Sequence, residues 1–222
     1  MRQLFIGLVA EGTTDVRFLK NVINRSVLEL SWQCDNQVEI YDVREIKVKG
    51  DSFTEKMLAA SRRACKEGLD ALCIHVDADA RSAEMVMQHK FAPFFDALNA
   101  MAKEECCKHI VPTVPIQMIE SWMLADKELL KRLINAEGKS DVDLGIEKAP
   151  EAYSDPKSTI ENAIRTATAG QSKKRRMQIT ISDLYELLGN SLQLEKLRTI
   201  PSFQGFERNV LRVFAEMGLM RG

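Results

Sequence analysis

Long apolar runs are absent from this chain, and so are several marks of specialised protein classes. No segment approaches the roughly 18–20 consecutive apolar residues that a membrane-spanning helix needs, so we expect the protein not to cross a bilayer. Its five cysteines lack any CxxC spacing, which argues against a disulfide framework and indicates a reducing, cytoplasmic location. The apolar residues 4–10 are followed by an acid where a signal peptide would carry small residues, and they are interpreted as a strand.

Compositional bias and a large excess of charge are absent as well. Hydrophobic residues at 45% and charged residues at 28% exclude disordered, collagen-like and low-complexity proteins. Thirty-one basic and 32 acidic residues nearly cancel over the 222 positions, leaving a formal net charge of −1. Residues 150–222 carry eleven Lys or Arg against eight Asp or Glu, and the remainder carries 20 against 24. An acidic front and a basic back suit a protein that binds a cation at one end and an anion at the other.

Strands and helices are expected to alternate along the first 135 residues. Continuous apolar runs over 4–10 and 71–76 are typical of strands buried on both faces of a sheet. This alternation predicts an α/β fold with a Rossmann-like parallel sheet flanked by helices. Further strands are predicted over 38–46 and 109–114, with helices over 16–30, 53–64, 82–103 (broken near Pro93) and 119–135.

The composition changes after residue 135. Residues 136–156 are rich in Gly, Asp, Glu and Pro, which is typical of an exposed connection. Residues 157–222 favour helices throughout. We therefore expect an α/β core over 1–135, a connecting segment over 136–156 and a small helical C-terminal part over 157–222 that packs on the core.

Acidic side chains follow three of the predicted strands at the points where those strands end. Because the carboxyl ends of parallel strands meet at one edge of a sheet, these carboxylates are expected to gather there. Hard oxygen ligands without a neighbouring His or Cys cluster favour Mg²⁺ or Mn²⁺ over zinc or copper. The candidate metal ligands are Glu11, Asp15, Asp77, Asp79, Glu120 and Asp126.

Several of these acids also have a purely structural interpretation. Asp15 lies in the first turn of a predicted helix, where the helix dipole favours a negative charge by about 0.3–1 kcal/mol. Asp77 or Asp79 could cap a helix or form an Asx turn, although two acids at this spacing repel each other. Asp126 falls on the apolar stripe of its predicted helix, where burial is costly unless the carboxylate meets a cation or hydrogen-bond donors; the purely structural interpretation is a buried partner such as Lys or Arg. Glu11 directly follows an apolar strand and is expected to be partly desolvated unless it is paired.

The motifs at the first two of these strand ends are similar to those of a known family. A strand that ends in Glu-Gly-x-x-Asp (residues 11–15) and a later strand that ends in Asp-x-Asp (residues 77–79) resemble the Toprim domain. That domain is shared by topoisomerases, bacterial primases, recombination-repair proteins and the overcoming-lysogenization-defect nucleases. The segments 112–126, 155–157 and 202–206 are similar to parts of a bacterial Toprim-related family of largely unknown function.

The resemblance implies specific roles in phosphodiester chemistry. Glu11 would act as the general acid or base or as a metal ligand, and Asp77 and Asp79 would bind the divalent metal. No tyrosine stands in a motif that would make it a topoisomerase nucleophile, which leaves hydrolysis by an activated water. The residues implied for a second metal or for the surroundings of the first are Asp15, Glu120 and Asp126.

Basic residues supply candidate contacts to phosphate. The run Lys173-Lys174-Arg175-Arg176 lies in a predicted polar connection and is either a solvated loop or a nucleic-acid contact. Ala80 stands where many Toprim domains have glycine, and the next residue, Arg81, could bind a phosphate or pair with the aspartates. Lys157 follows a proline at a predicted helix start, where an anion is favoured.

The sequence leaves three functions open. The first is a Mg²⁺- or Mn²⁺-dependent nuclease, acting on DNA or RNA. The second is a non-catalytic, Toprim-like binding or effector subunit that partners an ATPase in a defence or repair system. A lesser alternative is a haloacid-dehalogenase-type phosphatase with Asp77 as nucleophile, but that family carries its Asp-x-Asp motif on the first strand and continues it differently.

Overall fold

Parallel strands form the centre of the protein. The computed structural model describes residues 2–169 and 179–220, so the basic run Lys173–Arg176 lies outside the described residues. A four-stranded sheet has the strand order β4-β2-β5-β6. Strands β1 and β3 form a separate two-stranded sheet, and every pairing in both sheets is parallel. The strands are β1 (Arg2–Leu4), β2 (Ile6–Val9), β3 (Val38–Ile40), β4 (Arg44–Glu45), β5 (Ala71–His75) and β6 (Ile110–Thr113).

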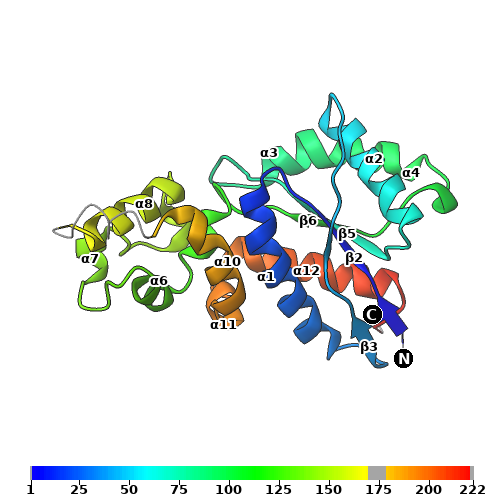
Figure 1. Cartoon of the computed structure of the whole chain (residues 1–222). Helices are drawn as coiled ribbons and strands as arrows, with labels where there is room; N and C mark the ends of the chain where they lie inside the picture. The colour runs from blue at the N-terminus through cyan, green and yellow to red at the C-terminus, as the bar shows by residue number, and fades with distance from the viewer. Residues whose placement is uncertain (1, 170–178, 221–222) are drawn as a thin grey trace.

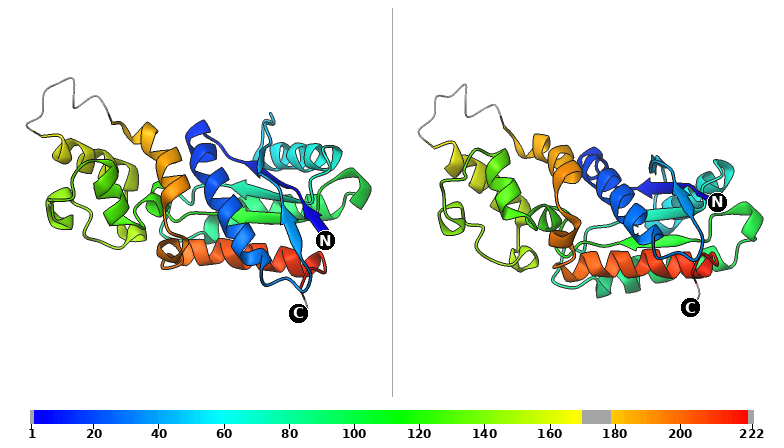
Figure 2. Two further views of the ribbon diagram at one scale, coloured as in Figure 1. Left: turned by 60° about the horizontal axis from the view of Figure 1, so that its bottom comes forward. Right: turned by 90° about the horizontal axis from the view of Figure 1, so that it is seen from below.

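Helices cover both faces of this sheet, as Figures 1 and 2 show. Helices α1 (Thr13–Ser31) and α12 (Pro201–Glu216) pack on one face. Helices α2 (Phe53–Lys66) and α4 (Ala92–Asn99) pack on the other face, together with the short α3 (Glu84–Val86). The predicted α/β architecture with helix-flanked parallel strands is confirmed and is compatible with a Rossmann-like fold.

The register of the strands explains why both faces are apolar. Leu8, Cys73 and Val111 are aligned across three neighbouring strands and lie in the apolar cluster with α1 and α12. The adjacent residues Leu72 and Ile74 point the opposite way, into the cluster with α2 and α4. Since successive side chains of a strand alternate between faces, a sheet covered on both sides needs the continuous apolar runs seen in the sequence.

The helix predicted over 82–103 contains a π-helical turn instead of a break at Pro93. The turn, η1 (Met87–Phe91), joins α3 to α4, and Pro93 lies in the first turn of α4. Proline has no amide hydrogen and its ring crowds the carbonyl four residues earlier. The wider π turn accommodates this, so the helical direction continues through the proline.

Between β6 and α12 the chain forms a lobe of short helices beyond the carboxyl ends of the strands (Figures 1 and 2). Residues 136–156 carry one helical turn and a 3₁₀ turn, and α12 returns to the sheet. The division into 1–135, 136–156 and 157–222 stays a prediction. The remaining elements are η2 (Lys103–Glu105), α5 (Glu120–Met123), α6 (Lys127–Leu133), α7 (Asp141–Leu144), η3 (Pro150–Ala152), α8 (Pro156–Ala167), α10 (Ile181–Ser191) and α11 (Leu194–Leu197).

Side chains of α12 cover the outer edge of β6. Asn209 Nδ2 donates to the carbonyl of Pro112 at 3.0 Å, and Arg212 Nη2 donates to the carbonyl of Ile110 at 2.9 Å. These bonds satisfy acceptors that an edge strand would otherwise offer to another chain. No helix among residues 2–169 and 179–220 combines the length and the apolar character needed to span a bilayer.

A close backbone contact joins the lobe to the core. Helix α10 lies against α1 at Gly189, where an added Cβ would stand 2.7 Å from the carbonyl oxygen of Phe18. Arg25 Nη2 of α1 donates to the carbonyl of Gly189 at 2.9 Å across the same contact. A glycine is therefore required here by the distance between two backbones.

We expect Gly189→Ala to lower the free energy of unfolding by about 1–3 kcal/mol, because the methyl group would push α10 away from α1. The matched control is Gly205→Ala in α12, where an added Cβ meets only the Arg208 guanidinium at 3.7 Å. That variant should gain up to about 1 kcal/mol from helix propensity. Urea unfolding followed by circular dichroism measures both, and equal stabilities of the two variants would contradict the α1–α10 contact.

Candidate active site at the carboxyl edge of the sheet

The loops that follow β5 and β6 are bonded to each other through their backbones. Ala78 N–H donates to Pro115 O at 3.0 Å, Asp79 N–H to Gln117 O at 2.8 Å, and Gln117 N–H to Ala80 O at 3.0 Å. Asp79 and Gln117 have φ angles of 49° and 60°. This left-handed conformation costs on the order of 1 kcal/mol for a residue with a side chain, and the paired loops hold it.

Asp77 is the fixed carboxylate of this edge. Its Oδ1 accepts the backbone N–H of Ile119 at 2.9 Å and lies 3.2 Å from His75 Nε2. The other ring nitrogen of His75, Nδ1, has no hydrogen bond and lies 4.0 Å from Asp15 Oδ2. Because His75 is only 2% exposed, it forms a buried link between the carboxylates that follow β5 and β2.

Asp15 combines the expected helix-start role with its place in this cluster. Its Oδ2 accepts the backbone N–H of Gly12 at 2.9 Å, at the start of α1, and its Oδ1 accepts the hydroxyl of Thr14 at 3.3 Å. The interpretation as a dipole-favoured acid in the first helical turn therefore holds. Its contact with His75 adds a second role, which joins the start of α1 to the end of β5.

Glu120 is buried beside Asp77 and bonded to the lobe. It is 5% exposed, and the hydroxyl of Tyr185 in α10 donates to its Oε1. Burial raises the pKa of Glu120; the Tyr185 hydrogen bond opposes that rise and the negative charge of Asp77 adds to it. Burial, Glu120 and the charge of Asp15 likewise raise the pKa of Tyr185, so its hydroxyl stays protonated.

Tyr185 is the site residue that the sequence does not reveal. It stands in no motif, and it reaches the cluster only because α10 packs on α1. His75 carries a weak local signal, since it lies on a buried strand two residues before Asp77. Together they make the cluster of Asp15, His75, Asp77, Glu120 and Tyr185, which we call the acidic cluster.

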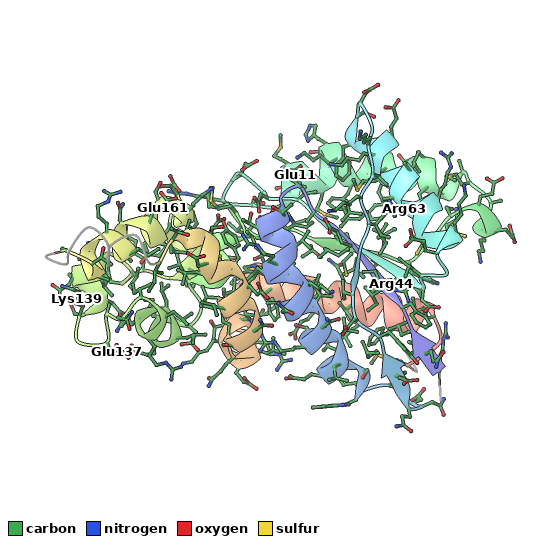
Figure 3. All side chains as sticks on the ribbon, viewed as in Figure 1. Glu11, Arg44, Arg63, Glu137, Lys139 and Glu161 are labelled. Atoms are coloured by element: carbon green, nitrogen blue, oxygen red, sulfur yellow. The ribbon has the colours of Figure 1, made fainter. Side chains whose placement is uncertain are left out.

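Glu11 and Asp79 are exposed, and Glu11 borders a separate cleft that Lys47 and Lys56 also line. The expected desolvation of Glu11 is not found, because β2 ends at Val9 and the chain turns toward solvent before α1 begins (Figure 3). Neither carboxylate has a hydrogen bond or ion pair with any described residue. Both side chains are therefore able to turn toward a ligand at this edge.

Asp126 has a structural role, in which a hydrogen-bond donor rather than a cation compensates its burial. The helix predicted over 119–135 is divided into α5 and α6, and Asp126 is the N-cap of α6. Its Oδ1 accepts the backbone N–H of Leu129 at 3.0 Å, so the buried carboxylate needs no Lys or Arg partner. Within the described part of the chain, no hydrogen bond or ion pair joins Asp126 to the acidic cluster.

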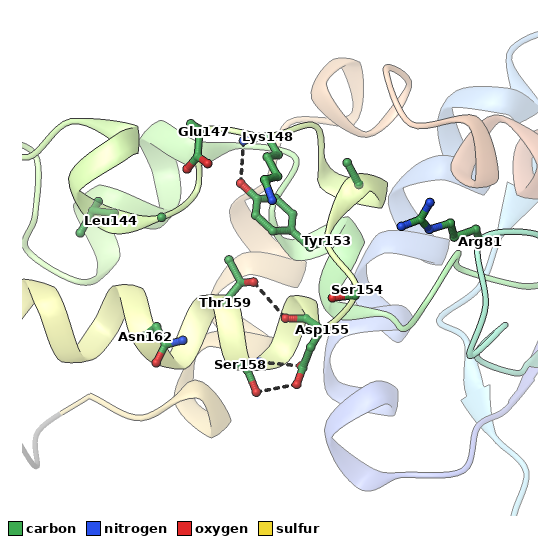
Figure 4. A pocket seen from close by; sticks show the side chains of 12 residues that line it. Arg81, Leu144, Glu147, Lys148, Tyr153, Ser154, Asp155, Ser158, Thr159 and Asn162 are labelled. Carbon is green, nitrogen blue, oxygen red and sulfur yellow. Dashed lines mark hydrogen bonds between the residues drawn. The ribbon is translucent and has the colours of Figure 1, made fainter.

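Two of the basic candidates, Arg81 and Lys157, lie around the same edge. Arg81 is exposed and borders a polar cleft of about 480 Å³ in the lobe, across from Asp155 (Figure 4). Lys157, at the start of α8, is exposed, and its charge opposes the rise in the pKa of Glu120. Asp155 itself caps α8, since its carboxylate accepts the N–H and hydroxyl of Ser158 at 2.8 and 2.6 Å.

The side chains of the acidic cluster are of the type that a hard divalent cation prefers, but their positions match a metal site only in part. Carboxylate oxygens are the ligands that Mg²⁺ and Mn²⁺ prefer. Over residues 2–169 and 179–220, however, no three His, Cys, Asp or Glu side chains are placed to hold a metal together. Asp77 would serve as the fixed ligand, and Asp79 and Glu11 would have to rotate toward it.

No family model matches the chain, and neither curated proteins nor solved structures give a significant match. The Toprim resemblance therefore stays a prediction from the motifs at residues 11–15 and 77–79.

The raised pKa of Glu120 gives a testable pH dependence. In the unfolded chain Glu120 has its ordinary pKa of about 4.5, whereas the folded protein keeps the carboxyl protonated to higher pH. The free energy that Glu120 contributes to folding therefore becomes less favourable as pH rises above 4.5. We expect Glu120→Gln, which keeps an acceptor for Tyr185, to unfold at a higher urea concentration than wild type at pH 7, with the difference shrinking toward pH 4.5.

The control is Glu186→Gln, an exposed neighbour on α10, which should shift the free energy of unfolding by no more than about 0.5 kcal/mol at either pH. Tyr185→Phe, which removes the donor from Glu120, should cost about 1–3 kcal/mol at pH 7. A stability gain of Glu120→Gln that is the same at both pH values would mean that folding does not raise the pKa of Glu120.

Proposed function

We propose that the protein is a divalent-metal-dependent phosphodiesterase, a nuclease that acts on DNA or RNA, with the carboxyl edge of the sheet as its active site. The observation that carries the proposal is the convergence of Asp15, Asp77 and Glu120 at that edge. Hydrogen bonds from Gly12, Ile119 and Tyr185 and the charge of the exposed Lys157 compensate these carboxylates in part. Such a concentration of carboxylates is costly unless it serves a cation or a proton transfer.

Each carboxylate has a distinct part in this proposal. Asp77 and Asp79 would hold a Mg²⁺ or Mn²⁺ ion, and the ion when bound would neutralise charge on the phosphate. Glu11, exposed and without a partner among the described residues, takes a proton from the attacking water or returns one to the leaving oxygen. His75 and the Ile119 N–H keep Asp77 oriented, since each contacts its Oδ1.

Phosphate groups of the substrate would lie on the basic side chains beside this edge. Arg81 follows Asp79 by two residues, and Lys157 lies close enough to influence the pKa of Glu120. Contacts of this kind do not depend on the base sequence and weaken as salt rises. The substrate therefore approaches from the side on which the lobe faces the sheet.

A non-catalytic binding or effector subunit that partners an ATPase is the second candidate. It is favoured by the absence, within the described ranges, of three side chains already placed to hold a metal. The two candidates differ in what they demand of the carboxylates. A binding subunit tolerates their neutral replacements, whereas the enzyme does not.

Metal binding is tested by thermal unfolding with Mg²⁺ or Mn²⁺ added to the protein and to Asp77→Asn/Asp79→Asn. At a metal concentration of about 100 times Kd, we expect a gain near 2.7 kcal/mol, or roughly 5–10 °C in Tm, for wild type alone. Asp96→Asn, an exposed charge change on α4, is the matched control and should respond as wild type does. Equal shifts in Tm for wild type and the double variant would show that the metal does not bind at Asp77 and Asp79.

Catalysis is tested by Glu11→Gln in a cleavage assay with single-stranded and duplex DNA and RNA. Loss of the proton-transferring group should lower kcat by roughly 10²–10⁴-fold. Because Glu11 is exposed and unpaired among the described residues, Tm and binding of the uncleaved substrate should not change. Cleavage that persists in Glu11→Gln, or that is absent from wild type with every substrate and metal, would favour the binding subunit.

A further inference from the structure

A second cleft opens between the loop after β5 and helix α12. Its volume is about 510 Å³, within the roughly 300–1,000 Å³ that small-molecule sites occupy. We call it the α12 cleft. It is lined by Arg81, Ser82, Ala83, Met87, Pro112, Val114, Ile116, Glu151, Pro201, Ser202, Gly205, Phe206, Arg208 and Asn209.

Three of the motif segments singled out in the sequence meet in this cleft. The residues after the Asp pair supply Arg81, the segment 112–126 supplies Val114 and Ile116, and the segment 202–206 supplies Phe206. The accessible apolar part of the lining comes from Met87, Ile116 and Pro201, because Val114 and Phe206 are only 8% and 1% exposed and belong to the core. It offers a flat, uncharged group a surface out of water.

Two cations and several fixed polar groups border the same cleft. The guanidinium groups of Arg81 and Arg208 are exposed, and neither has a hydrogen bond or ion pair within the described residues. The one carboxylate of the lining, that of Glu151, accepts the N–H of Ser202 at 3.2 Å at the start of α12. The cleft thus pairs an apolar surface with two uncommitted positive charges.

Gly205 is the residue that packing does not explain. It lies inside the 16-residue helix α12, where glycine is a poor helix former, and the protein has room for a Cβ because only Arg208 lies within 4 Å. At Gly189 the contact between two backbones requires the glycine, and here nothing in the fold does. Its effect is to keep the wall of the α12 cleft open.

We infer that the α12 cleft binds one unpaired nucleotide of a nucleic-acid strand, with the base on Met87, Ile116 and Pro201 and the flanking phosphates on Arg81 and Arg208. A base is planar and largely apolar on its faces, and it is joined to phosphates on both sides, which matches this lining. A paired base is not available to enter, so the cleft selects single-stranded substrate. The inference rests on the proposed function, because Arg81 connects the cleft to Asp79 and to the strand that would be cleaved.

The experiment measures binding by fluorescence anisotropy, with the full-length protein in EDTA so that no cleavage occurs. The probes are a labelled 12-nucleotide single strand and the duplex of the same sequence, as DNA and as RNA. The variants are Gly205→Leu, which fills the cleft, Gly205→Ala, which fills it in part, and Arg208→Gln. Arg62→Gln, an exposed charge change on α2 away from the cleft, is the matched control.

We expect wild type to bind the single strand about tenfold more tightly than the duplex, and Gly205→Leu to lose about tenfold for the single strand alone. Gly205→Ala and Arg208→Gln should weaken the same complex by lesser factors, and Arg62→Gln should not. A thermal midpoint of Gly205→Leu at or above that of wild type shows that the fold is intact. Equal affinity of wild type for single strand and duplex, or wild-type binding by both Gly205 variants, overturns the inference.

The metal-dependent cleavage assay separates this inference from the proposed function. If wild type cleaves and Gly205→Leu cleaves every substrate equally well, the active site stands and the cleft is not its base-binding site. If nothing is cleaved and Gly205→Leu still loses single-strand binding, the cleft stands as the recognition site of a binding subunit. Loss of single-strand cleavage by Gly205→Leu, with duplex cleavage unchanged, supports both the proposed nuclease activity and the binding of a nucleotide in the α12 cleft.

Discussion

The hydrogen bonds between the loops after β5 and β6 are the constraint on which the site depends. They connect residues 78–80 with residues 115–117 and hold two left-handed residues, Asp79 and Gln117, in place. Because this contact fixes the path from β6 into α5, it also places Ile119 beside Asp77 and Glu120 behind it. Arg81, one residue beyond the bonded segment, is thereby directed to the clefts beside the lobe.

The charged and buried polar groups at this edge lower the stability of the folded protein. Glu120 loses solvation and lies near Asp77, and its main compensation is the hydroxyl of a tyrosine whose own pKa is raised. The His75 ring lies between Asp15 and Asp77, and its buried Nδ1 has no hydrogen bond. Unfavourable groups of this kind persist in proteins where a ligand or a reaction uses them, which is why their convergence supports a functional site.

The lobe and α12 add a recognition surface to a core that is otherwise an ordinary parallel sheet. The contact of Gly189 with Phe18 brings α10 close to α1, and Tyr185 then reaches Glu120. Helix α12 protects the edge of β6 with Asn209 and Arg212 and lines a cleft with the residues of its first half. One helix therefore serves both the stability of the sheet and the proposed contact with a nucleotide.

Local pattern in the sequence was enough to identify the buried strands, the surrounding helices and the edge at which Asp15, Asp77 and Glu120 meet. Apolar runs and helical periodicity are properties of residues close together in the chain. Parallel strands with helical connections bring their carboxyl ends to one edge of the sheet, whatever the exact lengths of the strands and helices. The cap at Asp126, the exposure of Glu11 and the π turn before Pro93 depended on where each helix begins, which periodicity locates only within a few residues. Tyr185 and the α12 cleft were decided by tertiary structure alone, since each joins segments far apart in the chain whose packing leaves no local pattern.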